Sequence, residues 1–362
     1  QAVERFMKRY YLAARDVGNL TRIMCAAMEM DFRQRRTRWR EEFGSGQQFG
    51  PFTIRAGRIN LDPLLMFRED PLRMLTLFEL ALEQNADIHP HALQRLTRGL
   101  PALGNATRTN PQASEKFINI LTSKRNPERV LRLMNESGVL GRYMPDFGRI
   151  VAMMQFDMYH SYTVDEHTLK AIGILHGIET GALRQAAPVA TEAMPEIGSR
   201  RALYVAMLLH DIAKGRGGNH SVLGAEVALV VCPRLGLSHE ETETVSWLIL
   251  HHLLMSKIAF RYDLNDPQTI KDFASIVQSP ERLKLLLVLT VADIRAVGPN
   301  VWSGWKAALM RDLYYRCDAV LRGADPAVIA LGNAEEARQE VAAKLIDWDA
   351  ARFAAHAVNM PL

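Results

Sequence analysis

Histidine and aspartate residues gather in the middle of the chain in a pattern that suits metal chemistry. Eight of the eleven histidines lie between positions 160 and 252. His210 and Asp211 adjoin at the end of a strongly apolar segment, and Asp293 follows another such segment, 285–292. Burying an ionised carboxylate is costly unless the charge is paired or coordinated. We therefore expect a divalent metal ion to lie among these side chains.

The candidate ligands come from separate segments that are each expected to be helical. His167 lies one turn into a helix opened by Asp165, His252 ends an apolar segment, and His220 follows a glycine-rich break. Mixed imidazole and carboxylate ligands suit Mn, Fe, Zn or Mg. A lone buried histidine is usually a hydrogen-bonded core residue, so the interpretation depends on the order of all the ligands along the chain. These candidate ligands are His167, His210, Asp211, His220, His252 and Asp293.

The segments that must position these ligands are predicted to be helices. The only convincing strand pattern is a β-hairpin, in which residues 52–55 and 58–61 alternate around a two-residue turn. Before it we expect a helix over 1–31 and a glycine-rich loop over 44–50. Farther along we expect a loop over the proline-containing stretch 186–199 and a single helix over 239–256. From residue 63 onward the predicted architecture is all-α.

Composition places the chain among ordinary globular proteins. Of its 362 residues, 48% are hydrophobic and 23% are charged, and no apolar run is long enough to span a membrane. The three cysteines, Cys25, Cys232 and Cys317, are too far apart for a disulfide framework or a cysteine-based zinc site. The chain is therefore expected to be cytoplasmic and to have no membrane partner. A net charge of +4 does not by itself indicate a nucleic-acid partner.

Four longer motifs surround the candidate ligands. They span 158–168, 209–218, 252–256 and 290–294, and they read MYHSYTVDEHT, LHDIAKGRGG, HLLMS and TVADI. Their ligand order resembles that of the HD superfamily of metal-dependent phosphohydrolases. Together with the segment 143–148, the motifs closely resemble the bifunctional uridylyltransferase/uridylyl-removing enzymes that modify the PII nitrogen-signalling protein. The resemblance covers nearly the whole chain.

This resemblance implies that the chain hydrolyses a uridylyl group from a tyrosine of PII and releases UMP. It assigns metal binding to His167, His210, Asp211 and Asp293. His220 and His252 match positions that could complete a second metal site. Magnesium or manganese is the expected cofactor, with iron or zinc as alternatives.

Further residues are expected to act on the phosphate. The expected catalytic residues are Asp211, Lys214 and His220, of which Lys214 lies three positions past Asp211. A lysine at a helix C-terminus also interacts favourably with the helix dipole, and the two roles can coexist. The candidate contacts to the substrate or its phosphate are His160, Lys214, Arg216, Gly217 and Gly218.

The resemblance also divides the chain into three parts. Residues 1–145 are expected to form the helical end of the uridylyltransferase region, 146–325 the HD phosphohydrolase domain, and 326–362 a helical linker toward ACT domains. The transferase signature is Gly-Ser followed closely by Asp-x-Asp. Gly44-Ser45 is present, but no Asp-x-Asp follows it nearby. We therefore expect a central fragment that acts on uridylylated PII and lacks transferase activity.

Three other interpretations compete with this one. An HD phosphohydrolase acting on a free nucleotide would use the same metal site. A nucleic-acid-binding helical module would use the arginine-rich segment 33–40, which is more simply a solvated helix end. An inert scaffold with a dead site is disfavoured because every candidate ligand is present.

Overall fold

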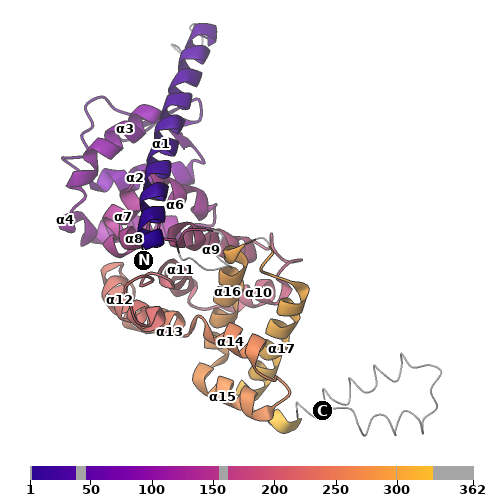
Figure 1. Ribbon diagram of the computed structural model, residues 1–362. Helices are drawn as coiled ribbons and strands as arrows, with labels where there is room; N and C mark the ends of the chain where they lie inside the picture. The colour runs from indigo at the N-terminus through magenta and orange to yellow at the C-terminus, as the bar shows by residue number, and fades with distance from the viewer. Residues whose placement is uncertain (1, 38–45, 155–161, 299, 329–362) are drawn as a thin grey trace.

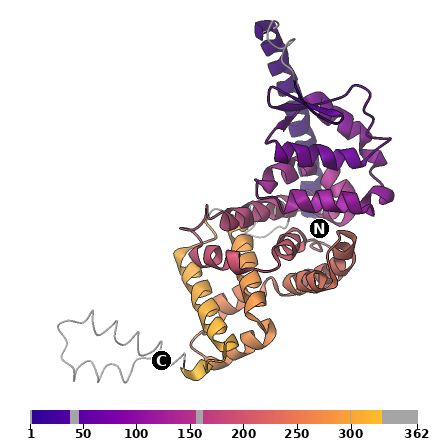
Figure 2. The same cartoon turned by 180° about the vertical axis from the view of Figure 1, so that it is seen from behind.

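The computed structural model describes residues 2–37, 46–154, 162–298 and 300–328. A long N-terminal helix, α1 (Ala2–Thr37), runs along a first group of helices and extends beyond it (Figure 1). The helices from α9 onward form a second group at the other end of the molecule (Figure 1). A small sheet belongs to the first group and is seen from behind in Figure 2.

The sheet holds the predicted hairpin at its centre. Its strands are β1 (Gln47–Phe49), β2 (Phe52–Arg55), β3 (Arg58–Leu61) and β4 (Asp87–Ile88). β2 and β3 pair antiparallel, and their turn residues Ala56 and Gly57 adopt positive φ angles of 49° and 73°. β1 adds a second antiparallel pair, and β4 pairs with β3 in parallel. The loop expected over 44–50 is therefore wrong for 47–49, and the chain after 63 includes one short strand.

The first helical group precedes the candidate ligands. Its elements are α2 (Leu72–Glu83), α3 (Pro90–Gly99), η1 (Leu100–Ala102), α4 (Asn105–Arg108), α5 (Pro111–Leu121), α6 (Pro127–Glu136), α7 (Val139–Tyr143) and α8 (Pro145–Ile150). α5 and α6 begin in the same way. Asn110 and Asn126 accept hydrogen bonds from backbone N–H groups of the first turn, and each is followed by proline.

The second group carries the candidate ligands. Its elements are α9 (Val164–Glu179), α10 (Pro188–Ala193), η2 (Met194–Glu196), α11 (Arg200–Leu209), α12 (His220–Arg234), α13 (His239–His251), α14 (Leu254–Arg261), α15 (Pro267–Val277), α16 (Pro280–Val297) and α17 (Gly304–Leu321). The loop expected over 186–199 is wrong for 188–196, because Pro188 occupies the first position of α10, where a missing N–H is tolerated. The single helix expected over 239–256 is divided into α13 and α14.

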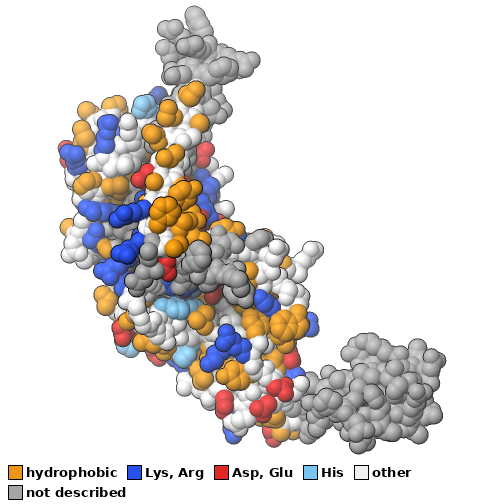
Figure 3. Space-filling view, in the orientation of Figure 1, with side chains coloured by type: hydrophobic (Ala, Val, Ile, Leu, Met, Phe, Trp, Pro, Cys, Tyr) orange, Lys and Arg blue, Asp and Glu red, His pale blue; other side chains and the backbone are white. Residues whose placement is uncertain are grey.

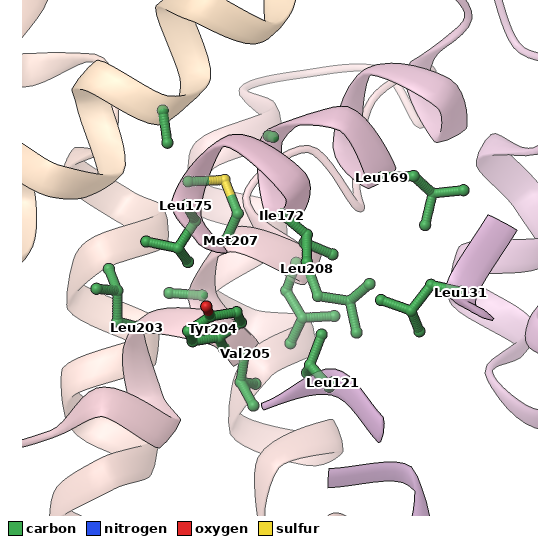
Figure 4. Packing of buried hydrophobic residues seen from close by; sticks show 14 of the residues in the cluster. Leu121, Leu131, Leu169, Ile172, Leu175, Leu203, Tyr204, Val205, Met207 and Leu208 are labelled. Atoms are coloured by element: carbon green, nitrogen blue, oxygen red, sulfur yellow. The ribbon is translucent and has the colours of Figure 1, made fainter. Parts of the chain in front are cut away.

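α11 is the buried centre of the second group. Eight successive residues, 202–209, are buried. A helix that is apolar on all sides must be enclosed by other elements. Figure 4 shows Met207 and Leu208 of α11 packed beside Ile172 of α9, with Leu121 of α5 and Leu131 of α6 closing the cluster. The core is thus continuous between the two helical groups, and it fixes the C-terminal end of α11.

The prediction of an all-α chain with one small β element is confirmed, although the β element is a four-stranded sheet rather than a hairpin. Within the described ranges, no helix combines the length and the apolar character that crossing a membrane requires.

Candidate metal centre

Five helices meet at one place in the second group, and each contributes a polar side chain from near one of its ends. These side chains are His167 on α9, His210 and Asp211 after α11, His220 on α12, His252 after α13 and Asp293 on α16. All six candidate ligands from the sequence therefore come together. Helix ends suit this purpose because the side chain of a terminal residue can turn away from its own helix.

His167, His210, Asp211 and Asp293 form a first group of ligand atoms. His167 Nε2 lies 2.9 Å from Asp293 Oδ1 and 3.3 Å from His210 Nε2. Asp211 Oδ2 lies 3.4 Å from His210 Nε2 and 3.8 Å from His167 Nε2. Three of these side chains are at most 3% exposed, and that of Asp293 is 14% exposed. The nitrogen and oxygen atoms thus face a common point that is largely closed to solvent.

Asp211 also belongs to a second group. Its other oxygen, Oδ1, lies 3.8 Å from His220 Nε2 and 3.9 Å from His252 Nε2. The ligand atoms of Asp211, His220 and His252 lie within 4.8 Å of one another, and so do those of His167, His210 and Asp211. One carboxylate therefore joins two sets of atoms that could each hold a metal ion.

Backbone carbonyls orient two of the imidazole rings. His210 Nδ1 lies 2.8 Å from Met207 O, and His252 Nδ1 lies 2.7 Å from Ile249 O. A carbonyl oxygen only accepts hydrogen bonds, so Nδ1 of each ring is the donor. Nε2 of each ring then faces Asp211. Such backbone contacts are typical of histidines that bind metals.

Opposite charges are concentrated among these buried groups. Burial disfavours the charge on His210, but Asp211 and Asp293 outweigh burial and raise the pKa of His210 to about 10. Burial also opposes ionisation of Asp211, yet His210 and Lys214 hold the pKa of that carboxyl well below its usual range. Burial lowers the pKa of His252 to about 4, so this ring is neutral at pH 7. The carboxylates require a neighbouring positive charge. Without a metal ion, His210 and Lys214 supply it.

His220 provides an independent observation in favour of a metal ion. Its Nε2 atom is buried and has no hydrogen-bond partner among the described residues. Burial lowers the pKa of His220, so the neutral ring is favoured. A buried polar atom without a partner is costly, and ligation of an ion would satisfy it. The donor set of imidazoles and ionised carboxylates fits a divalent metal ion, which would displace the proton from His210 on binding.

Lys214 lies beside the shared carboxylate. Its side chain is buried, and its Nζ atom lies 2.6 Å from Asp211 Oδ2. The lysine follows the turn after α11, and the next residue, Gly215, adopts a φ of +76°. Gly217 and Gly218 also adopt positive φ angles, +80° and +77°, so the glycines shape this turn.

The other predicted substrate contacts are placed differently. Arg216 Nη2 donates to Asp146 Oδ1 of α8 at 2.7 Å, so its guanidinium group is held by the first helical group. His160 lies outside the described residues. The same holds for the side chains of the arginine-rich segment 33–40 and for residues 329–362. Predictions that depend on them stay predictions.

Asp165 has a larger role than the helix opener expected from the sequence. Thr163 is the N-cap of α9, and Asp165 lies inside the first turn with 3% of its surface exposed. Its oxygens accept hydrogen bonds from Asn135 Nδ2 at 2.8 Å and from the backbone N–H of Ala152 at 3.1 Å. The carboxylate thus attaches the start of α9 to the first helical group, two residues before His167. In the sequence, the only sign of this role was the position of Asp165 in the first turn of a predicted helix.

Comparison with known proteins agrees with this geometry. A family model described as "Uridylyltransferase GlnD third domain" matches residues 52–143, and one described as "HD domain" matches residues 164–296. The second match contains all six candidate ligands.

Three curated relatives are each named "Bifunctional uridylyltransferase/uridylyl-removing enzyme". The relative from Azospirillum brasilense is 51% identical over 98% of this chain, and the one from Rhodospirillum rubrum is 51% identical over 96%. The relative from Novosphingobium aromaticivorans is 50% identical over 94%. The chain spans only 38%, 37% and 36% of the lengths of these relatives. The chain therefore belongs to the family of bifunctional uridylyltransferase/uridylyl-removing enzymes, over the part of their length that holds the third domain and the HD domain.

Proposed function

We propose that this chain is a metal-dependent phosphodiester hydrolase that removes a uridylyl group from a tyrosine of PII and releases UMP. The observation that carries the proposal is the convergence of four imidazoles and two carboxylates in one largely buried cluster of an HD domain. The names of the relatives supply the uridylyl group, and the sequence resemblance supplies PII as the partner.

His167, His210, Asp211 and Asp293 would hold one divalent ion, magnesium or manganese being expected. Asp211, His220 and His252 would hold a second. When bound, such an ion lowers the pKa of a water ligand to about 7 and offsets charge on phosphate oxygens. This chemistry needs a carboxylate that stays ionised, and the low pKa of Asp211 meets that requirement.

The remaining groups act on the water and on the phosphate. Where only the first ion is bound, the neutral His220 ring would instead accept a proton from the attacking water, because its Nε2 then has no other partner among the described residues. Lys214 would hold a phosphate oxygen with its ammonium group, assisted by Arg216 and by the N–H groups of Gly217 and Gly218. A water oxygen bonds to phosphorus while the bond from phosphorus to the tyrosine oxygen breaks. Phenolate, whose conjugate acid has a pKa of about 10, leaves without strong acid assistance.

We also propose the three-part division of the chain at residues 145 and 325. Two observations support it. The first family match ends at 143, close to the boundary at 145. The second match ends at 296 and α17 ends at Leu321, both before the boundary at 325. In this division no part of the chain carries the transferase signature, so the chain would not transfer UMP from UTP to PII. Detectable labelling of unmodified PII by the purified chain with UTP would refute that statement.

A substrate comparison tests the proposed function. The purified chain, with manganese or magnesium, would be supplied separately with uridylylated PII and with a panel of free nucleotides and cyclic dinucleotides. We expect metal-dependent UMP release from PII to exceed turnover of every free nucleotide. Preferential turnover of a free nucleotide would instead favour a nucleotide phosphohydrolase that uses the same metal centre.

A further inference from the structure

The exposed face of α1 carries a regular stripe of large apolar side chains. Seven of them are each between 54% and 68% exposed, and Figure 3 shows hydrophobic side chains gathered along this helix. They are Val3, Phe6, Tyr10, Val17, Leu20, Met24 and Met28. Soluble proteins rarely expose so continuous an apolar surface unless another element covers it.

The spacing of the stripe indicates what covers it. Val3, Tyr10, Val17 and Met24 are separated by seven residues each, and the same spacing relates Phe6, Ala13 and Leu20. This is the pattern of a heptad repeat, in which the first series occupies the a positions and the second series the d positions. The seam formed by a and d positions packs against another helix with the same repeat. The stripe therefore fits an α-helix rather than a flat surface or a small molecule.

α1 is already held in place on its other side. Tyr11 and Leu12 pack against the core, and Lys8 Nζ donates to Arg149 O at 2.8 Å. With about 3.6 residues per turn, these positions lie about half a turn away from the stripe. A partner helix would thus meet a helix that is already formed and anchored on its opposite side.

We propose that this stripe pairs with the same stripe of a second copy of the chain, in an antiparallel two-helix contact. In an antiparallel pair, a positions face d positions, and a two-fold axis makes each contact occur twice. One register places Val3 against Leu20, Phe6 against Val17, and Tyr10 against Ala13 of the second copy. Large side chains then face smaller ones in the two central layers.

Charges beside the stripe select this register. The g positions, which flank the seam, hold Arg9 and Asp16, and both residues are exposed. The side chain of Asp16 is 72% exposed and lies 3.6 Å from the guanidinium group of the neighbouring Arg15. In the stated register Arg9 faces Asp16 of the second copy twice. A shift of one heptad either way would bring two Arg9 or two Asp16 side chains together.

A parallel pair lacks this complementarity. In that arrangement g positions face e positions of the other helix, so Arg9 would face Ala14, and Asp16 would face Thr21. Neither contact joins opposite charges. The charge pattern therefore favours the antiparallel second copy over a parallel one.

Sedimentation of the full chain at increasing concentration tests the proposal. We expect a reversible monomer–dimer equilibrium. V17E should abolish the dimer, while L64E, which alters an 86% exposed apolar residue outside α1, should leave it unchanged. Circular dichroism of each variant verifies that α1 stays folded. A wild-type chain that stays monomeric at every concentration would overturn the proposal, and the stripe would then belong to a contact with another polypeptide.

Exchange of the flanking charges tests the register. R9D alone and D16R alone should each weaken association by about tenfold, because each brings like charges together twice. The double variant R9D/D16R should restore the wild-type dissociation constant. A dimer whose affinity is unchanged by the single variants, or is not restored in the double variant, would refute the antiparallel register.

Discussion

At the scale of single residues, Asp211 organises the site. One of its oxygens faces His167, His210 and Lys214, and the other faces His220 and His252. Its burial would be unfavourable without neighbouring cations, and the same burial strengthens every electrostatic contact at the site. A carboxylate with these properties would be able to hold ions and to remain charged when a proton is taken up nearby.

Replacement of Lys214 by methionine tests the role of its ammonium group. K214M should lower kcat for UMP release by about 100-fold, because it removes a preorganised positive charge that would contact the phosphate. Metal affinity should not fall, since Lys214 is not a ligand. Turnover and manganese titration would be measured in parallel, with K257M, at an exposed lysine of α14, as the matched control. Equal kcat values for K214M and the wild type would contradict the role.

The sequence was enough to select the candidate ligands, but it was not enough to predict the polar partners around them. His210 and Asp211 are adjacent and end an apolar segment, so the signal for them is local. The Arg216–Asp146 pair joins residues 70 positions apart, and Asp165 finds Asn135 on another helix. No local pattern records which distant polar group a side chain will reach, so contacts of this kind require the folded chain.

At the scale of elements, helix ends position the site, and this explains which predictions failed. α13 stops at His251 and the chain turns, which directs His252 toward Asp211, whereas the apolar pattern alone continues the helix to 256. β4 consists of two residues paired to β3 by backbone hydrogen bonds, so no alternation of side chains announces it. The hairpin was predictable because its strands and its turn carry their own signals.

The attachment of α9 to α6 should support the candidate metal centre. N135A removes the donor to the buried carboxylate of Asp165, and it should lower the free energy of unfolding by about 1–3 kcal/mol. It should also weaken metal binding, because the start of α9 carries His167. Denaturant unfolding and manganese titration would be compared with those of N119A, at an exposed asparagine of α5. Unchanged metal affinity in a destabilised N135A would limit Asp165 to a structural role.

A second polar cluster joins α9 to α11 and predicts a pH dependence. Glu179 Oε2 accepts hydrogen bonds from Arg200 Nη2 at 2.8 Å and from Tyr204 Oη at 2.7 Å. Burial opposes the charge on Glu179, but these donors outweigh it and lower the pKa of the carboxyl. A lowered pKa adds stability above the unfolded value of about 4.3, and this stability is lost as pH falls through the folded value.

E179Q should therefore destabilise the chain at pH 7, and the difference from the wild type should shrink as pH falls below about 4. Urea unfolding of both proteins at several pH values would measure this. E243Q changes a carboxylate that is 63% exposed and paired with Arg282, and it should have little effect at any pH. A constant difference between E179Q and the wild type across the pH range would argue against an ionised Glu179.

At the scale of the whole molecule, the candidate metal centre joins distant parts of the chain. Its candidate ligands come from α9 through α16, and α9 and α11 in turn share a core with α5 and α6. A bound ion should therefore stabilise the entire fold. Manganese at about 100 times its dissociation constant should raise the free energy of unfolding by about 2.7 kcal/mol. Thermal unfolding with and without manganese would detect the shift, and D211N should show none.

We propose that the cluster around Asp211 is a metal centre at which a uridylyl phosphodiester is hydrolysed. The most direct measurement is UMP release from uridylylated PII as manganese is added to the metal-free chain, for the wild type, D211N and the control D272N at an exposed aspartate of α15. We expect release that rises with manganese in the wild type and D272N and is absent in D211N. Release without a divalent metal, or undiminished release by D211N, would contradict it.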